Sequence, residues 1–406
     1  MKAQEMRRLE NRLEHFLEDL VSPMGRSERR HWAKRYVEGL LLDGERKSIE
    51  PIATRTGADV QALRQFVGQS PWDVALVQEQ LARKLGRRFP ALQAWLIDET
   101  SFPKAGSESV GVARQYCGAL GKTANCQVAV SLHLCTPRLS CPVAWRLYLP
   151  REWAEDPERR EKVKIPKEVN YRSKNGLALE LIEELGRWNV PKAPIVADSA
   201  YGNEFIFREA LRQQGLLYVL AVEPTAKVWI SDPNLIPVRE SKPIGRPRRY
   251  VAPEDLPKAK TLLEAARELP ASAWKSVTWR EGSKGPMRSR FALVPVWASH
   301  RACVQRHFER VREWLLIEWP REEDAPTKYW MGHFGEEPRP TLQEIVTLAH
   351  ARWRVELDYR ELKEELGLDH FEGRHWLGFH HHVTLVSMAY AFLRFEQLRS
   401  KKKPQP

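Results

Sequence analysis

The sequence predicts an α/β protein whose core is interrupted by a β-rich insertion and preceded by a helical domain. Three observations predict this fold. Apolar residues recur at helical spacing through residues 1–88, and strand-like runs then follow one another between Ala91 and Leu149, as in a meander of antiparallel strands. A proline-rich stretch with strand-like, tryptophan-bearing pieces, residues 225–340, then separates two segments that read as one α/β core.

The chain of 406 residues is too long for one ordinary domain, so we expect several parts. The expected parts are a helical domain (1–88), the first part of the core (89–224), the insertion (225–340), the closing helices of the core (341–400) and a basic tail (401–406).

The composition limits the partners of the protein. The formal net charge of +12 favours polyanions, with nucleic acid ahead of a membrane surface. No segment has the apolar length of a membrane span, and the charged N-terminus lacks the apolar stretch of a secretory signal. The five cysteines include no C-x-x-C pair and are odd in number, which argues against a disulfide framework. We therefore expect a soluble intracellular protein with reduced thiols and no membrane partner.

The helical region contains a segment that resembles a helix-turn-helix, Ser48–Gly68. Ala53 is small where two helices would cross, Gly57 permits the turn, and Asp59 is suited to cap the second helix. Two short helices around a glycine also occur in helical domains of any kind, so the motif alone leaves DNA binding open. Three side chains would point outward from the second helix and contact DNA: Gln61, Arg64 and Gln65.

Two expected strands of the core end on an aspartate. The run Ala94–Phe102 is apolar until Asp98 and Glu99, and a second apolar run ends on Asp198. An acid at the end of a strand is usually only the start of a loop, but a strand also holds a carboxylate firmly enough to bind a metal with partners. Because alternate residues of a strand point to opposite faces, only one of Asp98 and Glu99 can face such a site.

A third acid follows the expected insertion. The segment from Leu342 reads as one long helix that stops near Gly367. Arg352, Glu356 and Lys363 lie on one stripe of that helix. Three carboxylates can hold two Mg²⁺ ions about 4 Å apart for phosphodiester cleavage, with cations holding the flanking phosphates.

In this order of strand, strand, insertion and helix, the chain resembles bacterial insertion-sequence transposases of the DDE type. The match is to the branch with a Tyr-Arg-Glu-Lys signature: Arg352, Glu356 and Lys363 reproduce its last three members with the required spacing. Ala349 stands at the tyrosine position, so the aromatic member is absent. The family pattern favours Asp98 over Glu99 as the first acid.

The resemblance implies a ribonuclease-H-like mixed-sheet core and cut-and-paste transposition of an element with terminal inverted repeats. Asp98, Asp198 and Glu356 would be catalytic ligands of Mg²⁺, with Mn²⁺ as a substitute, while Arg352 and Lys363 would bind phosphates. The implied partners are double-stranded DNA at the element ends and at the target, and a second copy of the chain in a homodimer. The implied location is the bacterial cytoplasm, at the nucleoid.

Two alternatives to such a transposase stay open. One is a transposase-derived DNA-binding regulator that no longer cuts, and the other is a nuclease with the same core that does not transpose. The three acids argue against the regulator, because a pure binding protein needs no carboxylates facing phosphate.

Weaker signals lie elsewhere in the chain. Arg246 and Arg248 belong to a Gly-Arg-Pro-Arg segment that resembles a minor-groove hook but is equally well a solvated basic loop. The run His380–His382 suggests a metal, but consecutive helical residues point in different directions. We interpret that run as the start of a final helix.

Overall fold

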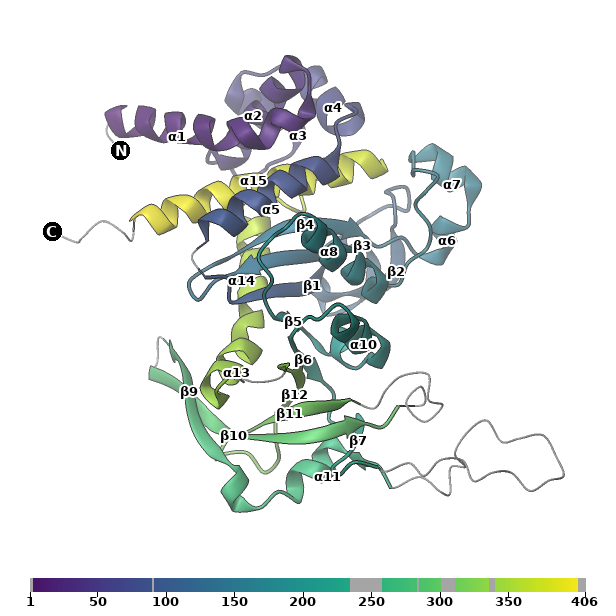
Figure 1. The fold of residues 1–406 in the computed structure, drawn as a ribbon. Coiled ribbons are helices and arrows are strands. Elements are labelled where there is room, and N and C mark those ends of the chain that lie inside the picture. The colour runs from purple at the N-terminus through teal and green to yellow at the C-terminus, as the bar shows by residue number, and fades with distance from the viewer. Residues whose placement is uncertain are drawn as a thin grey trace. The chain divides into compact units, whose positions relative to one another are not determined.

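The computed structural model describes residues 3–89, 91–233, 258–282, 285–300, 311–335 and 340–400. The chain divides into two compact units, Met1–Lys192 with Trp353–Pro406, and Ala193–Arg352 (Figure 1). Helices and strands occur in both units, and the strands pair in parallel and in antiparallel fashion, so the protein is α/β with mixed strand pairing, as predicted.

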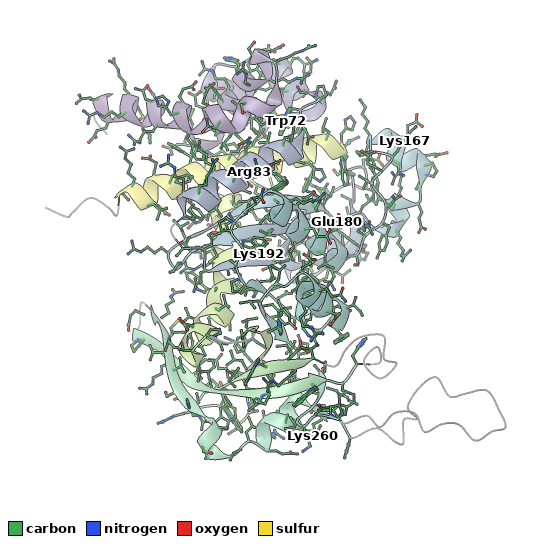
Figure 2. All side chains as sticks on the ribbon, viewed as in Figure 1. Trp72, Arg83, Lys167, Glu180, Lys192 and Lys260 are labelled. Carbon is green, nitrogen blue, oxygen red and sulfur yellow. The ribbon has the colours of Figure 1, made fainter. Side chains whose placement is uncertain are left out.

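The first unit begins and ends with helices that share one core. Phe16 lies 5.6 Å from Phe392 between ring centres, and Trp72, which is labelled in Figure 2, stacks on His381 at 3.7 Å. The helical region predicted for residues 1–88 is therefore packed against the C-terminal helix. The helices of this unit are α1 (Ala3–Val21), α2 (Ser27–Leu41), α3 (Ile49–Thr56), α4 (Val60–Gln69), α5 (Val74–Arg88), α6 (Arg151–Ala154), α7 (Pro157–Lys162), α8 (Lys174–Arg187), α14 (Trp353–Glu364) and α15 (Trp376–Ser400).

The four strands of the first unit are antiparallel but do not form the simple meander that we expected. The central strand β3 (Lys122–Cys135) pairs with β1 (Ala94–Pro103) on one edge. Its other edge pairs first with β2 (Ala113–Cys117) and then with β4 (Ser140–Leu147). The 14 residues of β3 are long enough to hold both partners in succession, which explains the difference from a meander.

The two faces of this sheet carry different helices. Trp145 of β4 donates its indole N–H to Ser387 of α15 at 2.8 Å, and α14 also packs against β1 and β4. The other face is covered by α8, where Arg146 pairs with Glu184. Alternate residues of β1 and β3 therefore point either toward α14 and α15 or toward α8.

The second unit is built on a sheet in which β5 (Ile195–Ala197) and β6 (Tyr218–Val222) are parallel. β12 (Lys328–His333) is antiparallel to β6, which continues this sheet into the segment expected as an insertion. The other elements are α9 (Ser199–Gly202), α10 (Phe205–Gln213), β7 (Lys227–Trp229), β8 (Lys260–Thr261), α11 (Leu262–Arg267), β9 (Lys275–Gly282), β10 (Gly285–Ala298), β11 (Arg312–Trp319) and α13 (Leu342–Ala349). Strands β9 to β12 all lie within residues 225–340, so the described part of this segment is rich in β-structure.

The histidine run lies in α15, as predicted, and its three imidazoles point to different partners. His380 Nδ1 is 2.9 Å from Trp376 O, His381 Nδ1 is 2.8 Å from Val67 O, and His382 Nδ1 is 3.0 Å from the Tyr36 hydroxyl. Burial lowers the pKa of His380 to about 3 and the pKa values of His381 and His382 to about 4. These histidines are neutral core residues.

Within the described residues, no helix is both long and apolar enough to cross a membrane.

Candidate active site

Asp98 lies in the middle of β1 and not at its end, which corrects the expectation that the strand stops on the two acids. All ten residues of β1 pair with β3, because Thr100, Ser101 and Phe102 continue the buried strand beyond the acids. Asp98 sits directly opposite Ser131 and is 7% exposed. Its Oδ1 accepts a hydrogen bond from the backbone N–H of Glu99 at 2.8 Å.

Glu99 points to the opposite face of the sheet, as strand alternation predicted. Its Oε1 lies 2.6 Å from the ammonium of Lys174 on α8. Ser131, the partner of Asp98, instead bonds to Tyr359 on α14. Asp98 therefore shares its face with the helix that carries Glu356, and Glu99 does not.

The helix expected to carry Arg352, Glu356 and Lys363 together is broken, which is a second correction. α13 ends at Ala349, a 3₁₀ turn covers His350–Arg352, and α14 begins at Trp353. The His350 ring stacks on Trp279 at 4.2 Å within the second unit, and this tertiary contact holds the turn away from helical continuation. Arg352 is thus outside the helix of Glu356 and Lys363.

Glu356 and Lys363 remain on one stripe of α14, two turns apart. Glu356 is exposed. The Lys363 ammonium donates a hydrogen bond to the backbone oxygen of Ser101 at 3.0 Å and lies 5.5 Å from the centre of the Phe102 ring. Burial lowers the pKa of Lys363 below its usual range. Lys363 therefore ties α14 to the end of β1.

Asp198 follows β5 directly in the second unit, where the sequence predicted a strand-end acid. Its carboxylate caps α9 by accepting a hydrogen bond from Ala200 N at 3.0 Å. Gly202 ends this turn against β6, and a Cβ there would lie 1.8 Å from Ala221 O. Only glycine fits so close an approach, so the position of the turn that presents Asp198 depends on it.

A buried ion pair supports the same turn. Arg208 on α10 donates to Gly202 O and, through Nε, to Glu313 Oε1 on β11, both within hydrogen-bonding distance at 2.5 Å and 2.8 Å. Glu313 also accepts from the Tyr218 hydroxyl at 2.6 Å. Its pKa is lowered: burial opposes the charged form, but the pairing with Arg208 outweighs this effect. These residues were not singled out from the sequence.

The three acids predicted from the sequence do not all belong to one unit. Asp98 and Glu356 belong to the first unit, and Asp198 belongs to the second. Their carboxylate oxygens have the hard-donor chemistry that Mg²⁺ prefers. Across the described parts of the chain, no three His, Cys, Asp or Glu side chains form a group that could hold a metal ion.

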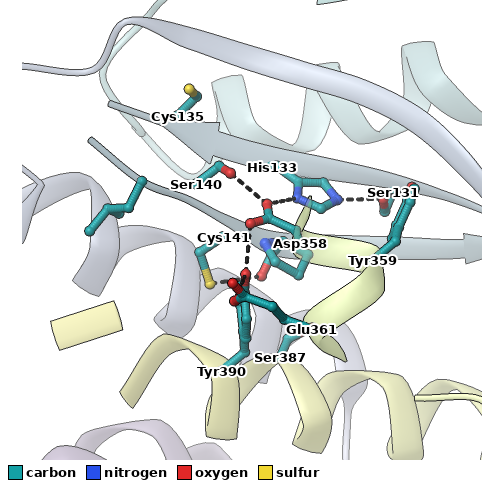
Figure 3. Close-up of polar contacts among 12 residues, drawn as sticks. Ser131, His133, Cys135, Ser140, Cys141, Asp358, Tyr359, Glu361, Ser387 and Tyr390 are labelled. Atoms are coloured by element: carbon teal, nitrogen blue, oxygen red, sulfur yellow. Dashed lines mark hydrogen bonds and ion pairs between the residues drawn. The ribbon is translucent and has the colours of Figure 1, made fainter. Parts of the chain in front are cut away.

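α14 carries a buried polar network that was not predicted from the sequence (Figure 3). Asp358 accepts hydrogen bonds from Ser140 at 2.6 Å and Tyr390 at 2.7 Å, and it pairs with His133 Nδ1 at 2.8 Å. The sequence did contain a signal of this network. Asp358 lies on the apolar stripe of α14 formed by Val355 and Leu362, and an acid on such a stripe requires buried partners.

Glu361 is the other acid of α14 that could rival Glu356. Its Oε2 accepts hydrogen bonds from Arg394 at 2.5 Å and Tyr390 at 3.0 Å, both on α15. Burial raises its pKa, although Arg394 opposes the shift. Glu361 is therefore engaged by α15, on a side of the helix different from that of Tyr359 and Ser131.

We expect Asp358→Ala to lower the free energy of unfolding by about 3–5 kcal/mol, because it leaves the buried Ser140 hydroxyl and the His133 imidazole without their partner, while Tyr390 and Arg394 keep only Glu361 as an acidic partner. Chemical denaturation of the full chain measures this change. Glu364→Ala is the matched control, since Glu364 is an exposed acid of the same helix. Equal losses from the two variants would contradict a stabilising role of the network.

The helix-turn-helix candidate has the local geometry expected from its sequence. Gly57 ends α3 in the left-handed region at φ +65°, and Asp59 caps α4 by accepting from Ala62 N at 2.7 Å. Ala53 is buried. Gln61, Arg64 and Gln65 are exposed on α4, and Arg64 pairs with Glu50 at 2.8 Å. Arg246, Arg248 and the tail from residue 401 lie outside the described residues.

Comparison with known proteins identifies the family. The family model described as DDE superfamily endonuclease matches residues 19–286, more than half of the chain. The chain belongs to this family. The match includes Asp98 and Asp198 and stops before Glu356. Endonucleases of this superfamily generally use divalent metal ions.

The chain is also 31% identical over 197 residues to a protein of Microchaete diplosiphon, described as a probable transposase for insertion sequence element IS701. The aligned part covers 47% of this chain and 48% of that protein, so the match spans about half of its relative. Together with the DDE endonuclease family, this likeness confirms the resemblance to insertion-sequence transposases.

Proposed function

We propose that this DDE endonuclease is the transposase of a bacterial insertion sequence, which binds terminal inverted repeats, cleaves them and transfers the strand to target DNA. The observation that supports the proposal is that Asp98 lies on the face of the sheet packed by α14, the helix that contains Glu356, in a chain that also has Asp198 directly after β5.

In this proposal Asp98, Asp198 and Glu356 hold Mg²⁺, with Mn²⁺ as a substitute. The bound ions would activate the attacking oxygen and stabilise the leaving oxygen. Lys363 and Arg352 bind the phosphates that flank the scissile bond. The Lys363 ammonium donates one of its three protons to Ser101, which leaves two for phosphate oxygens. No covalent link between protein and DNA forms, because the carboxylates act on metal ions.

The partners follow from the same proposal. Gln61, Arg64 and Gln65 contact the terminal repeat, and Arg246 and Arg248 add contacts to the DNA backbone or minor groove. Two element ends have to be cut together, so the active form is a homodimer on DNA. The protein would then work in the bacterial cytoplasm, at the nucleoid.

Incubation of the full chain with duplexes that carry its flanking genomic inverted repeats tests the function. With Mg²⁺ or Mn²⁺ we expect cleavage at the repeat ends and joining of the freed 3′-hydroxyl to a supercoiled plasmid, and with EDTA we expect neither. Binding without cleavage would support the regulator, and cleavage without joining would support the nuclease that does not transpose.

For end recognition, we expect Arg64→Glu to reduce the ratio of affinities for the terminal repeat and for random duplex by about tenfold, since one specific base contact contributes about 1–3 kcal/mol. Competition binding at fixed salt measures the ratio. Arg7→Glu on α1 is the matched control, because it is also exposed and changes the net charge equally. If both variants weaken both duplexes to the same extent, recognition lies outside α4.

A further inference from the structure

A continuous chain of hydrogen bonds joins β3 to α14 (Figure 3). The Tyr359 hydroxyl lies 2.7 Å from Ser131 Oγ, which lies 2.8 Å from His133 Nε2, and His133 Nδ1 lies 2.8 Å from Asp358 Oδ2. Ser131 and His133 are fully buried, Asp358 is 1% exposed and Tyr359 is 9% exposed. The chain thus joins two neighbouring residues of α14 through alternate residues of β3.

Two neighbouring members of this chain, Ser131 and Tyr359, are close in register or in sequence to the proposed metal ligands. Ser131 is directly opposite Asp98 in the pairing of β1 with β3, so both side chains leave the same face of the sheet. Tyr359 follows Glu356 by three residues and therefore lies one turn along the same side of α14. A single hydrogen bond between Tyr359 and Ser131 connects β3, the strand paired with that of Asp98, to the helix of Glu356.

We propose that Tyr359 and Ser131 are positioning residues, which hold Asp98 and Glu356 at the separation required to bind a divalent metal ion together. This inference rests on the proposed function. His133 and Asp358 act one step further back, by fixing the orientation of the Ser131 hydroxyl. None of these four residues touches the substrate.

The anchoring of the far end of the chain supports this role. Asp358 accepts hydrogen bonds from Ser140 and Tyr390 and also pairs with His133 Nδ1, so its carboxylate is fixed from two sides. The His133 ring joins Asp358 to Ser131, and Ser131 is in turn hydrogen-bonded to the Tyr359 hydroxyl.

The Tyr359 side chain is held at both its hydroxyl and its ring. Burial and the charge of Asp98 raise the pKa of Tyr359 well above its usual range, so the hydroxyl keeps its proton. The ring is held by His133 at 5.5 Å and Trp145 at 6.1 Å between ring centres.

The test is Tyr359→Phe in the full chain, which removes the hydroxyl and keeps the ring. We expect Mn²⁺ affinity, followed by the loss of the free-ion signal in electron paramagnetic resonance, to fall by about tenfold, and cleavage of repeat DNA by about 10–100-fold, as for other residues that orient metal ligands. DNA affinity without metal should stay unchanged. Ser131→Ala should have the same effect, and the double variant should be no worse than either single one.

Thr384→Val is the matched control, because it removes a buried α15 hydroxyl that accepts from Gln78 at 3.1 Å, away from this chain. It should lower thermal stability but leave Mn²⁺ affinity unchanged. The proposal is overturned if Tyr359→Phe binds Mn²⁺ as wild type does, or if Thr384→Val weakens binding equally.

Glu356→Gln in the same Mn²⁺ titration distinguishes a failure of the positioning role from a failure of the proposed function. If it lowers Mn²⁺ affinity and Tyr359→Phe does not, the positioning role is wrong while the proposed function stands. If Glu356→Gln changes neither Mn²⁺ affinity nor cleavage, the proposed function is wrong and the positioning role with it.

Discussion

Glu356→Gln is expected to reduce cleavage of repeat DNA by about 10³-fold or more, equivalent to about 4 kcal/mol of transition-state stabilisation, while the protein still binds DNA. Glutamine keeps the volume of the side chain but removes the negative charge that a divalent ion requires. DNA affinity should be unchanged or slightly higher, because one carboxylate no longer repels phosphate. Single-turnover cleavage and equilibrium binding measure the two effects separately.

The neighbouring acids of β1 supply the control for this prediction. Asp98→Asn should behave as Glu356→Gln does, whereas Glu99→Gln should be nearly silent, because Glu99 faces Lys174 across the other side of the sheet. Cleavage by Glu356→Gln at the normal rate would refute the assignment of the third acid. Glu361 would then be the acid of α14 to test, despite its contacts with Arg394 and Tyr390.

The buried histidines of α15 predict a large dependence of stability on pH. Burial lowers the pKa of His380 to about 3 and the pKa values of His381 and His382 to about 4, below an unfolded-state value of about 6.5. The unfolded chain therefore binds more protons, and the stability present above pH 6.5 is lost as the pH falls toward 4. At pH 5 the loss should be on the order of 2 kcal/mol for each imidazole.

Chemical denaturation between pH 7.5 and pH 5 measures this loss. His382→Gln should make the dependence of the free energy of unfolding on pH shallower by about one proton, since one of the three titrating groups is removed. The same dependence on pH in the variant and in the wild type would show that other groups cause the acid sensitivity.

Local patterns in the sequence were sufficient for several parts of this protein. The helical spacing of residues 1–88 is present as α1 to α5, and Gly57 and Asp59 end and begin their helices as predicted. Asp198 follows a short apolar strand, and Asp98 and Glu99 point to opposite faces. Each of these features depends on residues within a few positions of one another, so periodicity, caps and strand alternation specify them.

Contacts between distant segments decided the rest. β1 continues past Asp98 because every one of its residues finds a partner on β3, and β3 is central because it is long enough for both β2 and β4. The break at His350–Arg352 depends on stacking against Trp279, and the network of Tyr359 and Asp358 depends on β3 and α15. The sequence by itself determined which residues could be metal ligands, but only tertiary pairing and burial decided which of them share a face, because local propensities are weak beside such contacts.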